Sequence, residues 1–347
     1  MTRRILSGVQ PSGKLHLGNY FGAIRQHIAL QDEPDAECFY FIADYHALTT
    51  LSDLQPDPRL RRATLADNVH QVALDYLALG LDPNKAAFFR QSDVPEVTEL
   101  AWIFSTVTGM GLLERAHSYK DKVDRGIAPS VGLFTYPVLM AADILIYRSN
   151  IVPVGKDQVQ HLEMTRDMAG YFNNTFGVEV FPMPQERLDR AATVPGIDGK
   201  KMSKSYGNTI DIFAEGNPLK KIVRSVVTNS TPVEEPKDPD TCNVVALYQL
   251  FATPAELDKL RSLYRNPLED AESRAGRPFG FGHSKDLLLE KINAFFGPFR
   301  ERRKQLAARP DDVEDVLRAG ARKARTEAQK TMELVRSAVG MLPRPVA

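Results

Sequence analysis

Short apolar runs alternate with segments of helical spacing along the first half of the chain. Continuous apolar runs are typical of parallel strands buried on both faces, whereas helices repeat their apolar residues every three or four positions. We expect strands at residues 5–9, 38–42, 86–90 and 151–154. We expect helices at residues 17–30, at 59–79 and from about 159 to 172, and further helices inserted between strands over 95–149. The pattern predicts an α/β fold built on a parallel sheet.

The composition of the chain changes after Asp211. From there the spacing is helical, apart from an acidic loop with prolines at residues 231–240. We therefore place a domain boundary near residue 212, which gives an α/β domain over 1–212 and an all-helical domain over 213–347. Two basic clusters occur in the last hundred residues, and each is either a binding surface or a solvated helix face: Arg300, Arg302, Arg303 and Lys304, and Arg318, Arg322, Lys323 and Arg325.

The charge and cysteine content exclude several classes of protein. The 347 residues carry a formal net charge of zero, which argues against a globally basic nucleic-acid binder. Cys38 and Cys242 are the two cysteines, too few for a disulfide framework or a four-cysteine metal site. No stretch has the length of a secretory signal or a membrane span. These features predict a cytoplasmic protein with no resident metal.

The segment from Gly199 to Gly207 concentrates three lysines and two small hydroxyl residues between two glycines. Glycine permits unusual backbone angles, so the segment is predicted to be a loop. Ammonium and hydroxyl groups on a loop suit a polyanion such as a triphosphate. The alternative is a solvated basic turn.

A second loop of phosphate-binding type lies far upstream, at Gln10–Asn19. It joins the first expected strand to a helix, which is how nucleotide-binding α/β units begin, with the helix N-terminus facing the ligand. His16 and Gly18 lie at the start of that helix. A similar turn at Gly155–Gln158 follows the fourth expected strand, and its aspartate suits both a nucleotide contact and a helix N-cap.

One helix in the middle of the chain carries a candidate pocket. At helical spacing Tyr136, Met140, Asp143 and Tyr147 share a face that is apolar except for a single carboxylate. A buried aspartate needs a donor. The donor is either a basic residue such as Arg148 or the N–H of an indole ring, which is a donor only.

Two motifs give the chain a resemblance to the class I aminoacyl-tRNA synthetases. Residues 201–205 read KMSKS, and residues 16–19 match the HIGH motif with Asn19 in place of the last histidine. The runs at 136–145, 152–161 and 8–13 narrow the resemblance to the bacterial tryptophanyl-tRNA synthetases. This resemblance implies a Rossmann-type catalytic domain with a helical insertion, a helical anticodon-binding domain and a homodimer. It also implies ATP with Mg²⁺, L-tryptophan and tRNA(Trp) as ligands.

The resemblance assigns roles to particular residues. Those expected to bind ATP are Gln10, Pro11, Ser12, Gly18, Asn19, Gly155, Lys156, Asp157, Val194, Lys201, Met202, Ser203, Lys204 and Ser205. Those expected to bind tryptophan are Asp143, Met140, Tyr136 and Gln158. Activation of a carboxylate that is already ionised needs no general base, so catalysis is expected to rest on charge stabilisation. The candidates for that task are Lys201, Lys204, His16 and Lys122, the last of which is otherwise a surface lysine.

Three other functions remain open on sequence alone. A tyrosyl-tRNA synthetase would share the fold and both loops, and would use the pocket for a phenol. A non-catalytic paralogue would bind tryptophan or RNA, although the intact lysines at 201–205 argue against it. A small-molecule adenylating ligase would not need the basic helical tail.

Overall fold

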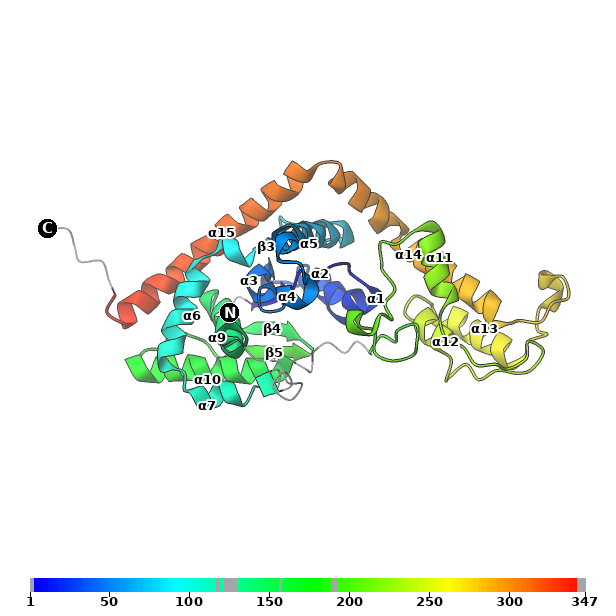
Figure 1. Ribbon diagram of the computed structural model, residues 1–347, viewed down its shortest axis with the longest axis horizontal. Coiled ribbons are helices and arrows are strands. Elements are labelled where there is room, and N and C mark those ends of the chain that lie inside the picture. Colours follow the sequence, from blue (N-terminus) through cyan, green and yellow to red (C-terminus); the bar gives the residue numbers. More distant parts are fainter. Residues whose placement is uncertain (1–2, 117–118, 121–129, 156–157, 189–192, 342–347) are drawn as a thin grey trace. The chain divides into compact units, whose positions relative to one another are not determined.

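The computed structural model describes residues 3–116, 119–120, 130–155, 158–188 and 193–341. The chain forms two compact units, whose elements are drawn in Figure 1. Unit 1 contains residues 1–13, 26–189 and 306–347, and unit 2 contains residues 14–25 and 190–305. This division differs from the expected single boundary near residue 212, because two segments of the expected catalytic domain group with unit 2 and the last helix groups with unit 1.

Unit 1 is built on a five-stranded parallel sheet with the order β3-β2-β1-β4-β5. The strands are β1 (Arg3–Val9), β2 (Ala36–Ile42), β3 (Ala86–Arg90), β4 (Ile151–Val154) and β5 (Gln185–Leu188). The chain runs outward from β1 to β3 and then resumes on the other side of β1. Reversal of the strand order at this point is the arrangement that opens a ligand crevice at the carboxyl ends of the strands. The expected α/β fold with a Rossmann-type parallel sheet is confirmed.

Helices cover the sheet of unit 1 and connect its strands. Those described in full are α2 (Arg25–Leu30), α3 (Asp44–Ala47), α4 (Leu51–Leu54), α5 (Pro58–Leu79), the 3₁₀ turn η2 (Gln91–Asp93), α6 (Glu96–Val107), α7 (Met110–Glu114), α9 (Val131–Ile146), α10 (Val159–Phe176) and α15 (Pro310–Ala338). In α5, Asp57 caps the first turn and Gly80 ends the helix at a φ of 113°, a conformation that favours glycine. Within the described part of 95–149 the structure contains helices and turns, as expected.

The two faces of the sheet are packed by different helices. On one face, His27 of α2 stacks on Tyr40 of β2, and Tyr76 of α5 stacks on Phe88 of β3. On the other face, residues of α6, α9, α10 and α15 form one buried cluster with Phe39 and alternate residues of the central strands. Burial on both faces explains why β2 and β3 are continuous apolar runs.

Helix α15 packs along the edge strand β3. Its apolar stripe includes Ala324, Ala328 and Met332, all within the buried cluster of unit 1. A Cβ at Gly320 would lie 1.9 Å from the carbonyl oxygen of Phe88, so only glycine permits this approach of helix to strand. Covering an edge strand with a helix protects its exposed backbone groups. The packing of α15 is the physical reason why the last helix belongs to unit 1.

Unit 2 is helical apart from short bridges and loops. Its elements are α1 (Leu17–Asn19), the π-helical turn η1 (Tyr20–Ile24), the 3₁₀ turn η4 (Lys204–Tyr206), α11 (Gly216–Arg224), α12 (Asn243–Tyr248), α13 (Pro254–Arg265), η5 (Ala271–Arg274) and most of α14 (Phe281–Ala307). Aromatic rings of η1, α14 and the turn after α12 form its core, with Tyr20 5.2 Å from Phe296 and Phe21 5.3 Å from Phe251 between ring centroids. The single helix expected over residues 17–30 is present as α1, the π-helical turn η1 and α2 in succession.

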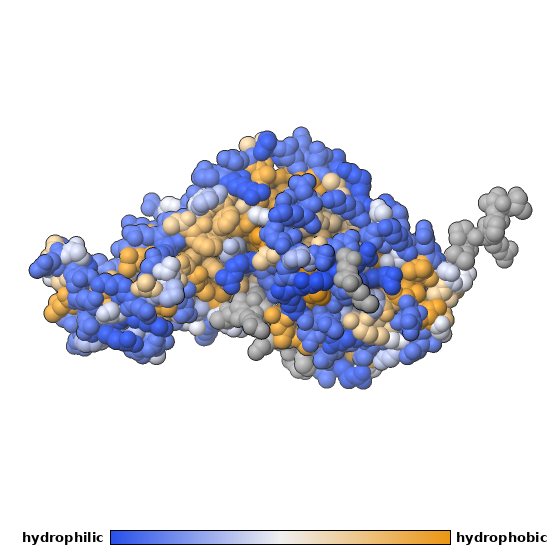
Figure 2. All heavy atoms as spheres, turned by 180° about the vertical axis from the view of Figure 1, so that it is seen from behind, coloured by the Kyte–Doolittle hydropathy of each residue, from blue (hydrophilic) through white to orange (hydrophobic). Residues whose placement is uncertain are grey.

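The surface of the molecule is mixed in polarity. Figure 2 shows apolar residues interspersed with hydrophilic ones on one face. In unit 1 the exposed large apolar residues include Trp102, Met110 and Val131, which are 70%, 62% and 79% exposed. Among the described residues, no helix combines the length and the apolar character that crossing a membrane requires.

Candidate active site

Asp143 lies on α9 with its carboxylate buried in unit 1 and only 2% of the residue exposed. Its Oδ2 atom is 2.8 Å from Nε2 of His46. Its two oxygens are 2.8 and 2.9 Å from Nε2 of Gln91, which donates to both. Burial raises the pKa of Asp143, and the hydrogen bonds from His46 and Gln91 oppose that rise. The carboxylate expected to need a donor has two.

The fold explains how these three residues meet. His46 is in α3, directly after β2, and Gln91 begins the turn after β3. Because β2 and β3 are adjacent and parallel, the residues after their carboxyl ends lie at the same edge of the sheet. Arg148, the basic partner suggested by the sequence, is exposed and has a φ of 50° just after α9. It appears in none of the contacts of Asp143 among the described residues.

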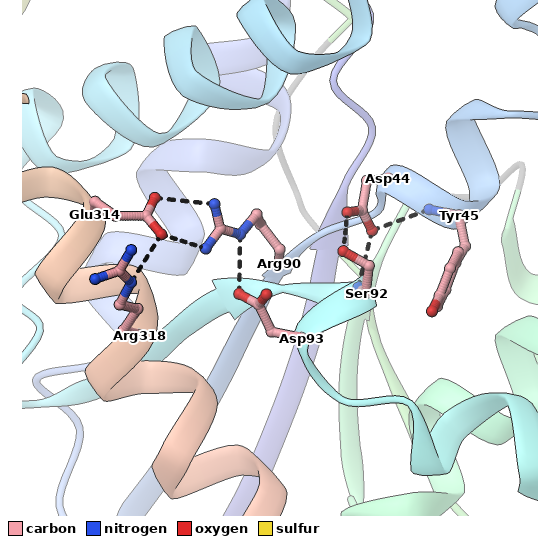
Figure 3. Close-up of polar contacts among 7 residues, drawn as sticks. All are labelled: Asp44, Tyr45, Arg90, Ser92, Asp93, Glu314 and Arg318. Atoms are coloured by element: carbon pink, nitrogen blue, oxygen red, sulfur yellow. Dashed lines mark hydrogen bonds and ion pairs between the residues drawn. The ribbon is translucent and has the colours of Figure 1, made fainter. Parts of the chain in front are cut away.

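A second carboxylate holds the turn after β3 in place, as Figure 3 shows. Asp44 accepts hydrogen bonds from the hydroxyl of Ser92 and, at 3.0 Å each, from the backbone N–H groups of Ser92 and Tyr45. Burial raises the pKa of Asp44, and the bonds from Ser92 oppose the change. The turn is therefore fixed to the start of α3.

The same turn is also tied to α15 (Figure 3). The guanidinium of Arg90 donates to both oxygens of Glu314, at 2.7 and 2.9 Å, and to Asp93 at 2.9 Å. Arg318 donates to Glu314 at 3.1 Å. Two parallel bonds between a guanidinium and a carboxylate are geometrically specific.

The other residues predicted to bind tryptophan occupy varied positions. The hydroxyl of Tyr136 is hydrogen-bonded to Nε2 of His161, and its ring meets that of His46 edge-on at 6.2 Å. Met140 is half-buried and packs against the hydrophobic cluster of unit 1. Gln158 precedes α10, and its N–H donates to the carbonyl of Gly155 at 3.0 Å. Of these three residues, Tyr136 lies beside the His46–Asp143 pair, because its ring contacts that of His46.

Several predicted nucleotide residues are in loops of unit 1. In the first loop, the N–H of Ser12 donates to the carbonyl of Gln10 at 2.9 Å, and Pro11 is buried. Gly13 has a φ of 95°, a conformation that favours glycine. In the second loop Gly155 is exposed. The predicted residues Lys156, Asp157 and Lys122 lie outside the described residues.

The end of the upstream loop, His16–Asn19, lies in unit 2 beside the lysine loop at 199–207. The N–H of Gly18 approaches the sulfur of Met202 at 3.3 Å. The side-chain oxygen of Asn19 accepts from the N–H of His16 at 3.0 Å, which closes the first helical turn. A Cβ at Gly18 would lie 2.9 Å from Nδ1 of His16, so this close packing suits glycine. The structure thus brings together two motifs that are about 180 residues apart in the sequence.

His16 is held in its neutral form. Burial and, to a lesser extent, the nearby charge of Lys204 lower its pKa to about 4, and Asp211 acts in the opposite direction. Its Nδ1 atom is buried and has no hydrogen-bond partner among the described residues. An uncharged imidazole has one nitrogen that donates and one that accepts hydrogen bonds.

A buried asparagine organises the lysine loop. The side chain of Asn208, which is 2% exposed, accepts from the N–H of Ser203 at 2.8 Å and donates to the carbonyl of Lys201 at 3.1 Å. The N–H of Met202 donates to the carbonyl of Val194 at 2.9 Å, so Val194 borders the loop. The residues predicted to carry charge, Lys201 and Lys204, are exposed, as is Ser205. Asn208 fixes the backbone and leaves the cationic groups at the surface.

Sequence reasoning missed Gln91 and Asn208 as members of these sites. Each is a polar residue that is buried only because of the tertiary structure. The position of Gln91 directly after an apolar strand was the available signal for it. Asn208 comes three residues after the KMSKS run, and no pattern in the sequence distinguishes it from a solvated turn residue.

The basic clusters are only partly exposed. Arg300 is buried in unit 2, where it donates to the carbonyl of Ile212 at 3.0 Å, and burial lowers its pKa. It therefore does not belong to a binding surface. On α15, Arg318 pairs with Glu314, and Arg325 pairs with Glu96 at 2.7 Å. Arg302, Lys304, Arg322 and Lys323 are exposed.

Comparison with known proteins gives consistent results. The sequence profile described as tRNA synthetases class I (W and Y) matches residues 2–297. The tryptophan–tRNA ligase of Fusobacterium nucleatum is 53% identical over 98% of both chains, and that of Rhodopirellula baltica is 50% identical over 97% of this chain and 99% of the other. The crystal structure of tryptophanyl-tRNA synthetase from Campylobacter jejuni complexed with ADP and tryptophan has a TM-score of 0.87 and 47% identity, and covers 97% of this chain and 99% of that one.

The match extends over nearly the whole length of the chain and of its relatives. It includes both nucleotide motifs and the helix that carries Asp143. The chain therefore belongs to the bacterial tryptophan–tRNA ligases, within the class I tRNA synthetases for tryptophan and tyrosine.

Proposed function

We propose that this chain activates L-tryptophan with ATP and then transfers it to tRNA(Trp). In the first step the tryptophan carboxylate attacks the α-phosphorus of ATP, the bond to the bridging oxygen breaks, and pyrophosphate leaves. In the second step a ribose hydroxyl at the 3′ end of the tRNA attacks the carbonyl carbon of the adenylate, and AMP leaves. Both steps depend on positioning and charge stabilisation.

The observation that carries this proposal is the contact of the lysine loop with the His16–Asn19 turn in one compact unit. The turn offers helix N-terminal N–H groups and a neutral imidazole, and the loop offers Lys201 and Lys204 on an ordered backbone. Such a pair suits a triphosphate, whose negative charge grows on the leaving pyrophosphate as the bond breaks. We propose that Lys201 and Lys204 stabilise this negative charge. We propose that His16 forms a hydrogen bond to the phosphates.

ATP would be held by residues of both sequence motifs and their neighbours. We assign this task to Gln10, Pro11, Ser12, Gly18, Asn19, Gly155, Lys156, Asp157, Val194, Lys201, Met202, Ser203, Lys204 and Ser205. Mg²⁺ enters with the triphosphate as part of the substrate. Lys122 remains a candidate third cation, because it follows Lys120 in a polar segment before the helix that carries Asp143. Binding of a nucleotide is supported by the similar Campylobacter jejuni synthetase, whose structure was solved with ADP and tryptophan.

We assign recognition of the indole N–H to Asp143. The carboxylate is buried and oriented by two donors, and Tyr136 and Met140 lie on the same helix. An indole N–H can only donate, so it requires an acceptor of this kind. Gln158 would contact the amino acid from the start of α10. A site that provides a hydrogen-bond partner rejects analogues lacking the matching group far better than shape does.

The remaining proposals concern larger partners. We propose that the helical part of the chain after residue 212 contacts the anticodon, with exposed residues such as Arg302 and Lys304 facing the phosphates. We propose a homodimer, as the resemblance to the bacterial tryptophanyl-tRNA synthetases implies. A ligase that needs tRNA and ATP would work in the cytoplasm, and the two buried free cysteines fit a reducing compartment.

ATP–pyrophosphate exchange tests the first step. We expect exchange that depends on tryptophan and is far weaker with tyrosine at the same concentration. Exchange with tyrosine instead would reassign the pocket to a phenol. Absence of exchange with every amino acid, in folded protein supplied with Mg²⁺, would favour a binding-only paralogue. Transfer to tRNA(Trp) transcript then tests the second step.

A further inference from the structure

The side chain of Gln91 is buried between the two elements that frame Asp143. Only 1% of the residue is exposed. Its Oε1 atom accepts from the backbone N–H groups of Tyr45 and His46, at 3.1 and 3.4 Å. Its Nε2 atom donates to both oxygens of Asp143. Gln91 thus connects the start of α3 to the carboxylate on α9.

These contacts fix which end of the carboxamide faces Asp143. Rotating the group by half a turn would place its N–H₂ against two backbone N–H donors. It would also place its oxygen against the carboxylate oxygens of Asp143. Both arrangements oppose like partial charges, because an N–H only donates and a carboxylate only accepts. Gln91 therefore presents a donor, and never an acceptor, to Asp143.

The same contacts determine which part of the carboxylate remains for a ligand. Two carboxylate oxygens offer about four lone-pair positions. The nitrogen of Gln91 is almost equally distant from both oxygens, so it lies between them and uses one position on each. His46 uses a second position on Oδ2. The described contacts leave the outer position of Oδ1 for a further donor.

We propose that Gln91 is a positioning residue that sets the selectivity of the pocket for a side chain bearing an N–H. It does so by orienting Asp143 and directing one lone pair of Oδ1 at the substrate. This inference rests on the proposed function and deepens it, because it identifies what selects tryptophan at the site already described.

The surroundings of Gln91 make it a firm support. The next residue in the turn, Ser92, is bonded to Asp44 by its hydroxyl and its N–H. The preceding residue, Arg90, is held by two bonds to Glu314 (Figure 3). Fixed neighbours on both sides allow a side chain to position another to within a few tenths of an ångström.

A pair of substrates separates positioning from general structure. The first is tryptophan, and the second is 3-(3-benzothienyl)alanine, in which sulfur replaces the indole N–H with little change in shape. KM and kcat are measured for both in ATP–pyrophosphate exchange, with wild type, Gln91→Met and the control Gln329→Met. Gln329 is an exposed glutamine on α15 that donates to Glu96 and not to Asp143. Gln329→Met is therefore the same chemical substitution at a position outside the Asp143 network.

We expect Gln91→Met to raise the KM for tryptophan about tenfold or more, the usual effect of weakening one hydrogen bond to a charged group. Its KM for the sulfur analogue and both kcat values should change less than twofold, and Gln329→Met should match wild type. If KM rose equally for both substrates, or if the ratio of the two KM values stayed at that of wild type, Gln91 would have only a structural role. Either result would overturn the proposal.

A second variant keeps the test decisive if Gln91→Met folds poorly. Gln91→Glu retains the volume and the acceptor for the two backbone N–H groups. At low pH a protonated Glu side chain can still donate to Asp143, whereas at high pH two adjacent carboxylates repel each other. We expect tryptophan selectivity near that of wild type at pH 6 and a loss of about tenfold by pH 9. A flat profile would contradict the proposal.

The other titratable groups that face this pair are the same in every variant: His46 and Asp44 from the start of α3, and Tyr147 from α9. Wild type measured over the same range is therefore the reference for any pH dependence that does not come from residue 91. Wild type also separates the two hypotheses. If it activates no tryptophan, the proposed function fails. If it does so while the Gln91 variants keep full selectivity, only the role of Gln91 fails.

Discussion

Replacing Asp143 with alanine should cost both stability and selectivity. The substitution removes the acceptor of Gln91 and of His46, whose nitrogens lie 2.8 Å from the carboxylate. Each charge-assisted hydrogen bond contributes about 1.5–3 kcal/mol, so the two together contribute about 3–6 kcal/mol. Burial of the charge offsets part of this, as the raised pKa of Asp143 shows. We expect a net loss of about 3 kcal/mol in the free energy of unfolding.

Urea unfolding at pH 7.5, followed by circular dichroism at 222 nm, measures this loss. Asp143→Asn is the matched control, because its side-chain oxygen still accepts from one donor, and we expect it to lose about half as much. The network in the structure predicts a folded but weakened Asp143→Ala protein. A loss below about 1 kcal/mol for Asp143→Ala would refute the argument that the network stabilises unit 1.

The same variant tests recognition. Removal of the acceptor should raise the KM for tryptophan by tenfold or more and reduce the preference for tryptophan over its sulfur analogue. Both effects are measured on protein that circular dichroism shows to be folded. Normal tryptophan affinity in folded Asp143→Ala protein would remove Asp143 from the pocket.

Three further predictions concern other groups. Lys204→Ala should slow adenylate formation about a hundredfold in single-turnover assays with little change in tryptophan binding, and an unchanged rate would exclude Lys204 from the mechanism. Asn208→Ala removes the bonds to Ser203 and Lys201, and should raise the KM for ATP about tenfold while that for tryptophan stays constant; parallel rises in both would show a general structural defect. Burial lowers the pKa of His27 to about 4 from its ordinary 6.5, so the unfolded chain binds a proton first and stability falls as pH drops from about 6.5 to 4. Between pH 7.5 and pH 5 the free energy of unfolding of His27→Phe should fall about 2 kcal/mol less than that of wild type, and equal losses would contradict a neutral buried imidazole.

The apolar pattern predicted most of the sheet because most of its strands are buried. Strands β1 to β4 coincide with the four apolar runs to within a few residues. Strand β5, Gln185–Leu188, was not predicted, because it lies at the sheet edge and three of its four residues are exposed. A strand whose side chains face solvent leaves no alternation of apolar residues for the sequence to show. The order of the strands is likewise absent from the pattern.

The assignment of helices to domains was harder to predict than the helices themselves. Helix α15 has an amphipathic sequence that suits any apolar partner, and the sequence does not specify which one. The structure packs it on β3 through Gly320, whose missing Cβ permits the contact. A glycine inside a helix usually signals a weak position, and here it marks a close helix–strand approach. The boundary near residue 212 was drawn from composition, which does not record such long-range contacts.

The sequence predicted the residues of the candidate site that carry its chemistry. It did not predict the buried polar residues that hold them in position. His16 and Met202 stand out because they belong to family motifs, and Asp143 stands out as a carboxylate on an apolar helix face. Gln91 and Asn208 do not stand out, since glutamine and asparagine are common on surfaces. Their importance arises only when folding buries them against backbone groups and charges. A single sequence contains the residues of such a network but not the distances that define it.

The position of Gln91 shows why this fold suits selective recognition. A lone buried carboxylate would be costly and would titrate toward its neutral form, which donates as well as accepts. Here the carboxylate of Asp143 is fixed as an acceptor by donors from two other elements, His46 after β2 and Gln91 after β3. Those donors meet because adjacent parallel strands end at one edge of the sheet. The same residues on strands in another order would not form the site, so the sheet order itself determines which hydrogen-bonding group a substrate must carry.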